Sequence, residues 1–137
     1  MIPTRSSNDD SDEVRKICDI AIIPYGDCID NVSVCCEPTR QEICDALNEG
    51  HLETRNYQND LEALKSEWFD ASRGATDIDG WKKVVTRYHA RRIAYFVANG
   101  WDDPIIVGSD GRISDGSHRI RAAMFTGMQE IKVRIQK

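Results

Sequence analysis

The sequence lacks an apolar run long enough to cross a bilayer, and it lacks a secretory signal. Its first residues, Met1–Asp12, are polar and acidic. It also contains no internal repeat and no low-complexity segment. These absences argue against a membrane-spanning or secreted protein, so we expect a soluble protein of the cytoplasm with no membrane partner.

Cys-x-x-Cys pairs are also missing, although the chain has five cysteines. Such pairs are the usual signature of a structural zinc site, and an odd count without a secretory signal argues against a disulfide framework. We therefore expect the cysteines to act as small buried apolar side chains. They are Cys18, Cys28, Cys35, Cys36 and Cys44.

The composition that remains is typical of one globular domain. A chain of 137 residues can bury one real core but not two. Hydrophobic residues make up 40% and charged residues 30% of the sequence, which is ordinary for a globular protein. The net charge of −5 argues against a protein that coats nucleic acid nonspecifically, although it leaves a local basic patch open.

Local patterns predict the order of helices and strands in the first part of the chain. Residues 1–13 are rich in Ser, Asn and Asp and predict a flexible tail, and a first strand is expected within residues 14–23. Thr39 and Glu42 form a capping-box pattern at the start of a helix that runs to about Asn48. Further elements are expected over residues 29–34 (extended), 57–71 (helix) and 81–99 (long helix). The buried face of the long helix is expected to comprise Trp81, Val84, Val85, Tyr88, Phe96 and Val97.

The last part of the chain predicts a hairpin, a helix and a closing strand. The β-branched run Ile105–Val107 is followed by Asp110-Gly111, a dipeptide suited to a tight turn, and by a return strand over Arg112–Ser114. The next helix is expected to end at Gly127, and residues 131–135 alternate like a half-buried strand.

Between the hairpin and this helix lies a glycine elbow, Asp115–Arg119. Asp115-Gly116 breaks the strand, and Asp115 or Ser117 is expected to cap the helix. A helix start offers backbone N–H groups and the positive end of a dipole, which together suit an anion. His118 and Arg119 add side-chain donors suited to phosphate. The elbow is therefore the first candidate for a binding or active site.

This region resembles the ParB/sulfiredoxin-like superfamily over roughly residues 93–135. The family pattern is an apolar strand, a turn, a strand ending in Asp-Gly-x-His-Arg, a helix with Ala-Ala, and a strand after a Gly-containing turn. Further upstream, Asp19–Pro24 is similar to the family's opening strand. The matching residues are Pro104, Ile105, Val107, Asp115, Gly116, His118, Arg119, Ala122, Ala123 and Gly127.

The resemblance implies an α/β (α+β) fold: a single small domain over residues 14–137, with a mixed sheet, packed helices and a helical insertion at about residues 36–80. It also implies that the elbow helix holds the phosphates of a nucleotide such as ATP, with Mg²⁺. Family members include ATP-dependent sulfiredoxins, free-serine kinases, CTP-binding partition proteins and nuclease-like proteins. Ser117 stands where sulfiredoxins carry their nucleophilic Cys, so reduction of a sulfinic acid is not expected.

Each elbow residue then has an expected role. The backbone after Gly116, with Ser117, would cradle a phosphate, and Arg119 would pair with its oxygens. His118 would donate a hydrogen bond or act as an acid. Asp115 is the candidate general base or magnesium ligand, and its alternative role is a turn cap.

Nearby charged residues receive structural interpretations. Arg121 lies two positions from Arg119, so we expect it to point to another face. Asp102 and Asp103 could position a metal ion, but a turn before Pro104 explains them better.

The long helix carries a second, accessory candidate for anion binding. Lys83, Arg87 and Arg91 recur every fourth residue and share one side of the helix, with Arg92 beside them. A solvated charged face is the favoured interpretation, and an anion-facing stripe is the alternative. His89 is expected to be a surface or half-buried helix residue.

Three functions remain open from the sequence. The first is a nucleotide-dependent phosphotransferase or NTP hydrolase. The second is a non-enzymatic interaction protein, such as a phage- or plasmid-type inhibitor, that reuses the fold and binds a protein partner. The third is a nuclease-like protein that binds DNA, against which the acidic net charge counts.

Overall fold

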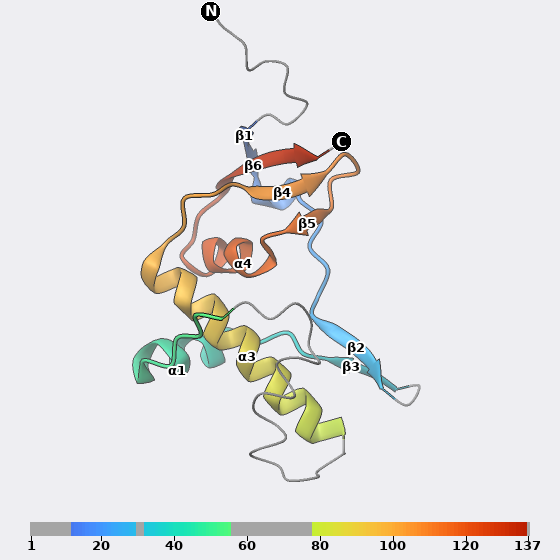
Figure 1. Ribbon diagram of the computed structural model, residues 1–137, viewed down its shortest axis with the longest axis vertical. Coiled ribbons are helices and arrows are strands. Elements are labelled where there is room, and N and C mark those ends of the chain that lie inside the picture. Colours follow the sequence, from blue (N-terminus) through green and yellow to red (C-terminus); the bar gives the residue numbers. More distant parts are fainter. Residues whose placement is uncertain (1–11, 30–31, 56–77, 137) are drawn as a thin grey trace, which may run out of the picture. The chain divides into compact units, whose positions relative to one another are not determined.

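The computed structural model describes residues 12–29, 32–55 and 78–136 (Figure 1). The chain forms two compact units: one combines the residues up to Ile23 with those from Gly100 onward, and the other runs from Pro24 to Asn99. The boundaries of the second unit differ from those of the insertion expected at residues 36–80, part of which lies outside the described residues. With helices and a four-stranded mixed sheet, the protein belongs to the α+β class, as the sequence predicts.

The sheet of the first unit has the order β1-β6-β4-β5. β6 (Glu130–Gln136) pairs in parallel with β4 (Ile105–Gly108) and antiparallel with β1 (Asp12–Lys16). β4 and β5 (Ile113–Asp115) form the expected hairpin, and α4 (Ser117–Phe125) connects this hairpin to β6. The predicted order strand–strand–helix–strand is therefore confirmed.

The core of this unit lies between the sheet and α4, which covers one sheet face (Figure 1). Alternate residues of β6, Ile131 and Val133, are buried while Lys132 between them is exposed, which is the expected period of two. Ile120 and Ala123 of α4 pack against the same cluster. Each fully buried aliphatic side chain of this kind contributes about 1.5–3 kcal/mol, so the cluster holds the start of α4 firmly on the sheet.

The first strand differs from the prediction. β1 begins at Asp12, within the expected tail, and ends at Lys16, so the expected strand over residues 14–23 is too long. A 3₁₀ helix, η2 (Ile17–Asp19), follows. Its three-residue period turns Ile17 and Ile20 to the same side, where both are buried in the core.

The segment Asp19–Pro24, expected to be an opening strand, is likewise not part of a regular strand. Ala21 alone forms an isolated bridge with Arg112, accepting a hydrogen bond from Ile113 N at 3.3 Å and donating to Gly111 O at 2.9 Å. This bridge lies beside β5, so the segment lines the sheet edge without extending the sheet.

The second unit contains an antiparallel hairpin and two described helices. The hairpin consists of β2 (Gly26–Ile29) and β3 (Val32–Cys35), and α1 (Arg40–Glu49) packs against α3 (Ile78–Asn99). The helix expected over residues 57–71 lies outside the described residues.

The capping box of α1 is confirmed. Thr39 Oγ1 accepts from the N–H of Glu42 at 3.2 Å, and the Glu42 carboxylate accepts from the N–H of Thr39 at 2.8 Å. Gly50 ends the helix in the left-handed conformation with φ of 73°. Local sequence alone thus sets both ends of this helix.

The long helix α3 buries more of its circumference than one amphipathic face. Val84, Val85 and Tyr88 are buried as expected, whereas Phe96 and Val97 are only half-buried. Ala90, Ile93 and Ala94 are buried in addition. The side chain of Trp81 lies outside the described part of the structure.

His89 corrects another expectation because it is buried, with 4% of its surface exposed. Its ring stacks on Tyr25, with ring centroids 3.7 Å apart and planes 3° from parallel. Tyr25 reaches α3 from outside the helix, so no periodicity within α3 could have shown that this position is covered.

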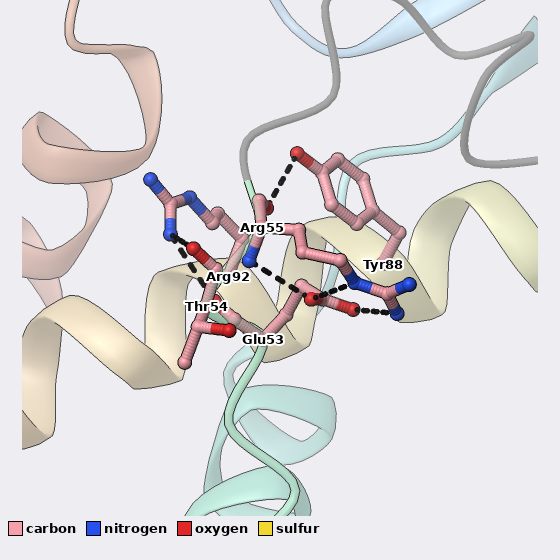
Figure 2. A network of polar contacts seen from close by, with 5 residues as sticks. All are labelled: Glu53, Thr54, Arg55, Tyr88 and Arg92. Atoms are coloured by element: carbon pink, nitrogen blue, oxygen red, sulfur yellow. Dashed lines mark hydrogen bonds and ion pairs between the residues drawn. The ribbon is translucent and has the colours of Figure 1, made fainter. Parts of the chain in front are cut away.

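Arg92 is also buried, at 9% exposure, and does not extend the basic surface. Figure 2 shows its guanidinium donating to the carbonyl oxygens of Glu53 and Thr54, at 3.2 and 2.9 Å. Tyr88 adds a hydrogen bond to Arg55 O at 3.4 Å. These side chains hold the segment after α1 against α3, so their role in the fold is to secure a loop.

Candidate functional site

The elbow positions the start of α4 through the backbone of Gly116. This residue is the N-cap of α4 and has φ of 108°, a backbone conformation that residues other than glycine rarely adopt. A Cβ at this position would lie 2.6 Å from Ile105 Cγ2 and 2.8 Å from Ile105 Cβ. Glycine is therefore required both by the backbone conformation and by the close approach of the elbow to β4.

No side chain caps α4 at this N-cap, so the expected capping by Asp115 or Ser117 is wrong. The reason is that glycine itself occupies the N-cap position, and a capping side chain must belong to the N-cap residue. The first turn of α4 contains no acidic residue. The helix start therefore keeps the positive end of its dipole without a carboxylate in the first turn.

A pocket of about 200 Å³ opens at this helix start. Asp115, Gly116 and Ser117 contribute to its wall, as the sequence predicts for a binding site, and Arg121 joins them. Its remaining lining residues are Ile22, Ile23, Ile113 and Ser114. The pocket thus combines an apolar side with the polar elbow, and His118 and Arg119 are not among its lining residues.

Arg119 is turned toward the protein backbone. Its Nη1 donates to Asp103 O at 3.1 Å and Pro104 O at 3.3 Å, and its Nη2 lies 3.3 Å from Asp115 Oδ2. Only 13% of the side chain is exposed. In this position the guanidinium ties α4 to the chain that leads into β4, an arrangement that serves the fold.

Arg121 is the residue that sequence reasoning missed. It is 6% exposed, with Nη1 donating to Ser117 O at 3.1 Å and Nη2 donating to Ile23 O at 2.9 Å. Its position four residues after Ser117 could have indicated it, because residues at this spacing lie on one helix face. The expectation that Arg121 points away from Arg119 is correct, but the face it occupies is the one beside the pocket.

Asp115 is the exposed acid of the elbow, with 70% of its side chain accessible. Asp102 and Asp103 are exposed as well, and the backbone carbonyl oxygen of Asp103 accepts a hydrogen bond from Arg119. Within residues 12–29, 32–55 and 78–136, no three His, Cys, Asp or Glu side chains come together in a group that could hold a metal ion. Asp115 could therefore contribute one ligand to Mg²⁺, with phosphate oxygens and water supplying the others.

The accessory basic stripe lies in the second unit, where it faces acidic residues. Lys83, Arg87 and Arg91 line a groove of about 220 Å³. The groove also contains three acidic side chains of α1: Glu42, Asp45 and Glu49. Opposite charges across the groove reduce the potential that an incoming anion would meet, which favours the charged-face interpretation of the stripe.

The neighbourhood of Arg91 follows the same pattern. Its Nη2 lies 3.3 Å from His51 Nδ1, which in turn lies 3.3 Å from Glu49 Oε1. Arg91 is thereby linked through His51 to Glu49, an acidic residue of α1.

The described cysteines, Cys18, Cys35, Cys36 and Cys44, carry free thiols. Cys36 is fully buried as expected, but Cys18 and Cys35 are exposed, so the expectation of buried side chains is only partly met. A span of the length and apolarity needed to cross a membrane is found in none of the described helices.

Comparison of the chain with protein-family models, with curated proteins and with solved structures finds no match. The function must therefore be inferred from the residues of the elbow.

Proposed function

We propose that the elbow pocket binds a phosphate group and that the protein is a phosphate- or nucleotide-binding protein of ParB/sulfiredoxin-like type. The observation that supports this proposal is the pocket at the N-terminus of α4, where Gly116 and Ser117 lie beside the buried guanidinium of Arg121. Helix N-termini and guanidinium groups both favour phosphate oxygens. In a cytoplasmic protein, a nucleotide such as ATP, with Mg²⁺, would be the natural source of the phosphate.

In the enzymatic form of the proposal, the protein is a phosphotransferase or NTP hydrolase. The pocket positions the phosphate to be transferred, and Asp115 accepts the proton of the attacking hydroxyl or water. His118 belongs to the same helix start and would act from outside the pocket wall. Arg119 acts as a positioning residue, because its contacts hold Asp115 and the chain leading into β4.

A binding protein without turnover is the second candidate. The observation that favours it is that Arg119 is not among the residues that line the pocket and donates instead to two carbonyl oxygens of the chain before β4. A nuclease-like role receives no comparable support, because the basic stripe of α3 faces carboxylates.

The substitution Ser117→Asp tests the phosphate site, and Ser117→Asn is its matched control. A carboxylate at the first position of α4 is favourable for the helix dipole, so the fold should be retained while an anion is repelled. We expect calorimetric titration of ATP, CTP and GTP with Mg²⁺ to show binding by wild type. In Ser117→Asp we expect a loss of about tenfold or more, and in Ser117→Asn a much smaller change.

Absence of nucleotide binding by folded wild-type protein would refute a nucleotide as the ligand, and equal binding of a nucleotide by both variants would refute the phosphate site itself. If wild type binds, phosphate release and transfer assays on Asp115→Asn then distinguish the two candidates. Turnover that Asp115→Asn abolishes supports the enzyme, whereas binding without turnover supports the binding protein.

A further inference from the structure

Two hollows lie between α4 and residues 17–23, and together we call them the furrow. Residues 17–23 run beside the helix in the opposite direction, and hydrogen bonds hold both ends of this segment. At one end Arg121 Nη2 donates to Ile23 O at 2.9 Å, and at the other Ile17 N donates to Gln129 O at 2.8 Å. The furrow therefore lies between two parts of the chain within the first unit.

The helix side of the furrow changes from polar to apolar along its length. Ser117, Arg121 and Met124 are spaced by four and then three residues, so they lie on one face of α4. Beyond the helix, Gly127 N donates to Met124 O at 3.1 Å and Met128 N donates to Ala123 O at 3.0 Å. This Schellman motif folds Met128 back toward the last turn and extends the apolar end.

The apolar end is a groove of about 900 Å³, and we call it the methionine groove. Met124 and Met128 both line this groove, and 49% and 45% of their surfaces are exposed. Ile17, Cys18 and Ile20 line it as well, and Lys16, Gln129 and Glu130 complete the lining. Ile22 lines both this groove and the elbow pocket, so the two hollows share a wall.

We propose that the elbow pocket and the methionine groove together bind one free amphiphilic molecule, a phosphate monoester of an aliphatic alcohol. Its phosphate would occupy the elbow pocket beside Arg121, and its chain would pass Ile22 into the methionine groove. This inference rests on the proposed function, because the phosphate seat is the same. It adds the chemical class of the group that the phosphate carries.

The lining favours an aliphatic chain over a nucleobase. No aromatic side chain of the described residues lines either hollow, so a base would have no stacking partner there. Flexible methionine side chains adapt well to an alkyl chain. From Ser117 to Met124 this side of α4 spans about 10 Å at the helical rise per residue, a length that an extended alkyl chain can cover.

Calorimetry with the full chain tests the inference with three probes: decyl phosphate below its micelle concentration, ethyl phosphate, and decyltrimethylammonium. Because each buried methylene raises affinity about fourfold, we expect decyl phosphate to bind at least about 100-fold more tightly than ethyl phosphate. We expect decyltrimethylammonium, which has the chain but a cationic head, to bind weakly or not at all.

The double substitution Met124→Gln/Met128→Gln should lower the affinity for decyl phosphate about tenfold and leave ethyl phosphate unchanged. Val14→Gln is the matched control, because Val14 is 62% exposed on β1 and does not line the groove. Thermal melts of all variants check that each one is folded.

Different failures have different meanings. Equal binding of ethyl and decyl phosphate overturns the inference but leaves the phosphate site intact. Equal binding of decyl phosphate and decyltrimethylammonium overturns the shared site, because the phosphate then contributes nothing. No heat with any phosphate probe refutes both proposals. Capture by vesicles of anionic lipid, without binding of monomeric decyl phosphate, also overturns the inference because the ligand would then be a membrane surface.

Discussion

The elbow of the first unit and the basic stripe of α3 contain similar cations, but their surroundings differ. Arg121 of α4 is buried and lines a pocket whose only acidic lining residue in the described structure is Asp115. Lys83, Arg87 and Arg91 instead share their groove with three carboxylates of α1. The comparison teaches that the residues opposite a cation, which can come from anywhere in the chain, decide whether it can receive an anion.

Within the elbow, the largest effect is expected from Gly116→Ala. A Cβ there meets Ile105 at 2.6 Å, and the residue would also have to keep φ of 108°. The combined clash and backbone strain should lower the free energy of unfolding by about 3 kcal/mol or more.

Gly127→Ala is the matched control for this substitution. Gly127 has φ of 86°, but nothing lies within 4 Å of the added Cβ. Strain alone should then cost about 1–2 kcal/mol in denaturant unfolding. Equal losses for the two variants would show that the contact with Ile105 contributes nothing.

A smaller effect is expected from Arg119→Met, which keeps the apolar stem and removes the hydrogen bonds to Asp103 O and Pro104 O. We expect about 2 kcal/mol of lost stability, since two carbonyl oxygens lose a charged donor. Arg112→Met is the control, because Arg112 is 68% exposed and lies 3.9 Å from its acidic partner, so it should cost less than about 0.5 kcal/mol.

If Arg119 positions the elbow and does not itself bind phosphate, the folded fraction of Arg119→Met should bind ATP within about threefold of wild type. A loss of ATP affinity of more than about 100-fold in fully folded protein would show that Arg119 binds the phosphate. The contrast between Arg119 and Arg121 would then be weaker.

The second unit offers a test by pH at Glu53, beside Arg92. Burial raises the pKa of Glu53, but hydrogen bonds from the side chain and backbone of Arg55, and the charges of Arg55 and Arg92, outweigh it and hold the pKa below its usual 4.5. The unfolded state therefore takes up a proton first as the pH falls. The stabilisation is present above about pH 4.5 and is lost as the pH falls through the lower pKa of the folded state.

Glu53→Gln should accordingly flatten the decline of stability below pH 4.5, measured by urea unfolding across a pH series. Glu49→Gln, at a 62% exposed side chain, is the control and should leave the decline nearly unchanged. An unchanged decline in Glu53→Gln would mean that Glu53 is equally stabilised in the unfolded chain.

The smallest effect is expected from Lys83→Gln in the basic stripe. Lys83 is exposed and faces α1 across the groove, so stability should change by less than about 0.5 kcal/mol. Phosphate binding at the elbow should stay within about twofold of wild type. A loss of phosphate affinity comparable to that of Ser117→Asp would show that the basic stripe contributes to the phosphate site.

Local chemistry predicted those elements whose determinants lie within a few residues. The capping box of Thr39 and Glu42, the Asp110-Gly111 turn and the left-handed Gly127 all occur where the sequence places them. The period of β6 also predicted which of its residues join the core. In each case the backbone conformation follows from residues that are neighbours along the chain.

Contacts between distant residues could not be predicted in the same way. The stacking of Tyr25 on His89, and the contact of Arg92 with Glu53 O, join parts of the chain that no period connects. At Ile17 a 3₁₀ turn replaces the expected strand, and Ile17 and Ile20 both join the core cluster. These contacts depend on how distant parts of the chain pack together, which the propensities of neighbouring residues do not determine.

The amino-acid sequence by itself determined the glycine elbow: a strand, a residue free to adopt positive φ, and a helix start rich in donors are consecutive in the chain. Only the tertiary structure decided which arginine faces the pocket. Arg119 and Arg121 are nearly adjacent in sequence, yet one meets the backbone before β4 and the other meets Ser117 and Ile23. The physical reason is that a guanidinium is directed by the carbonyl oxygens around it, and these are brought there by folding.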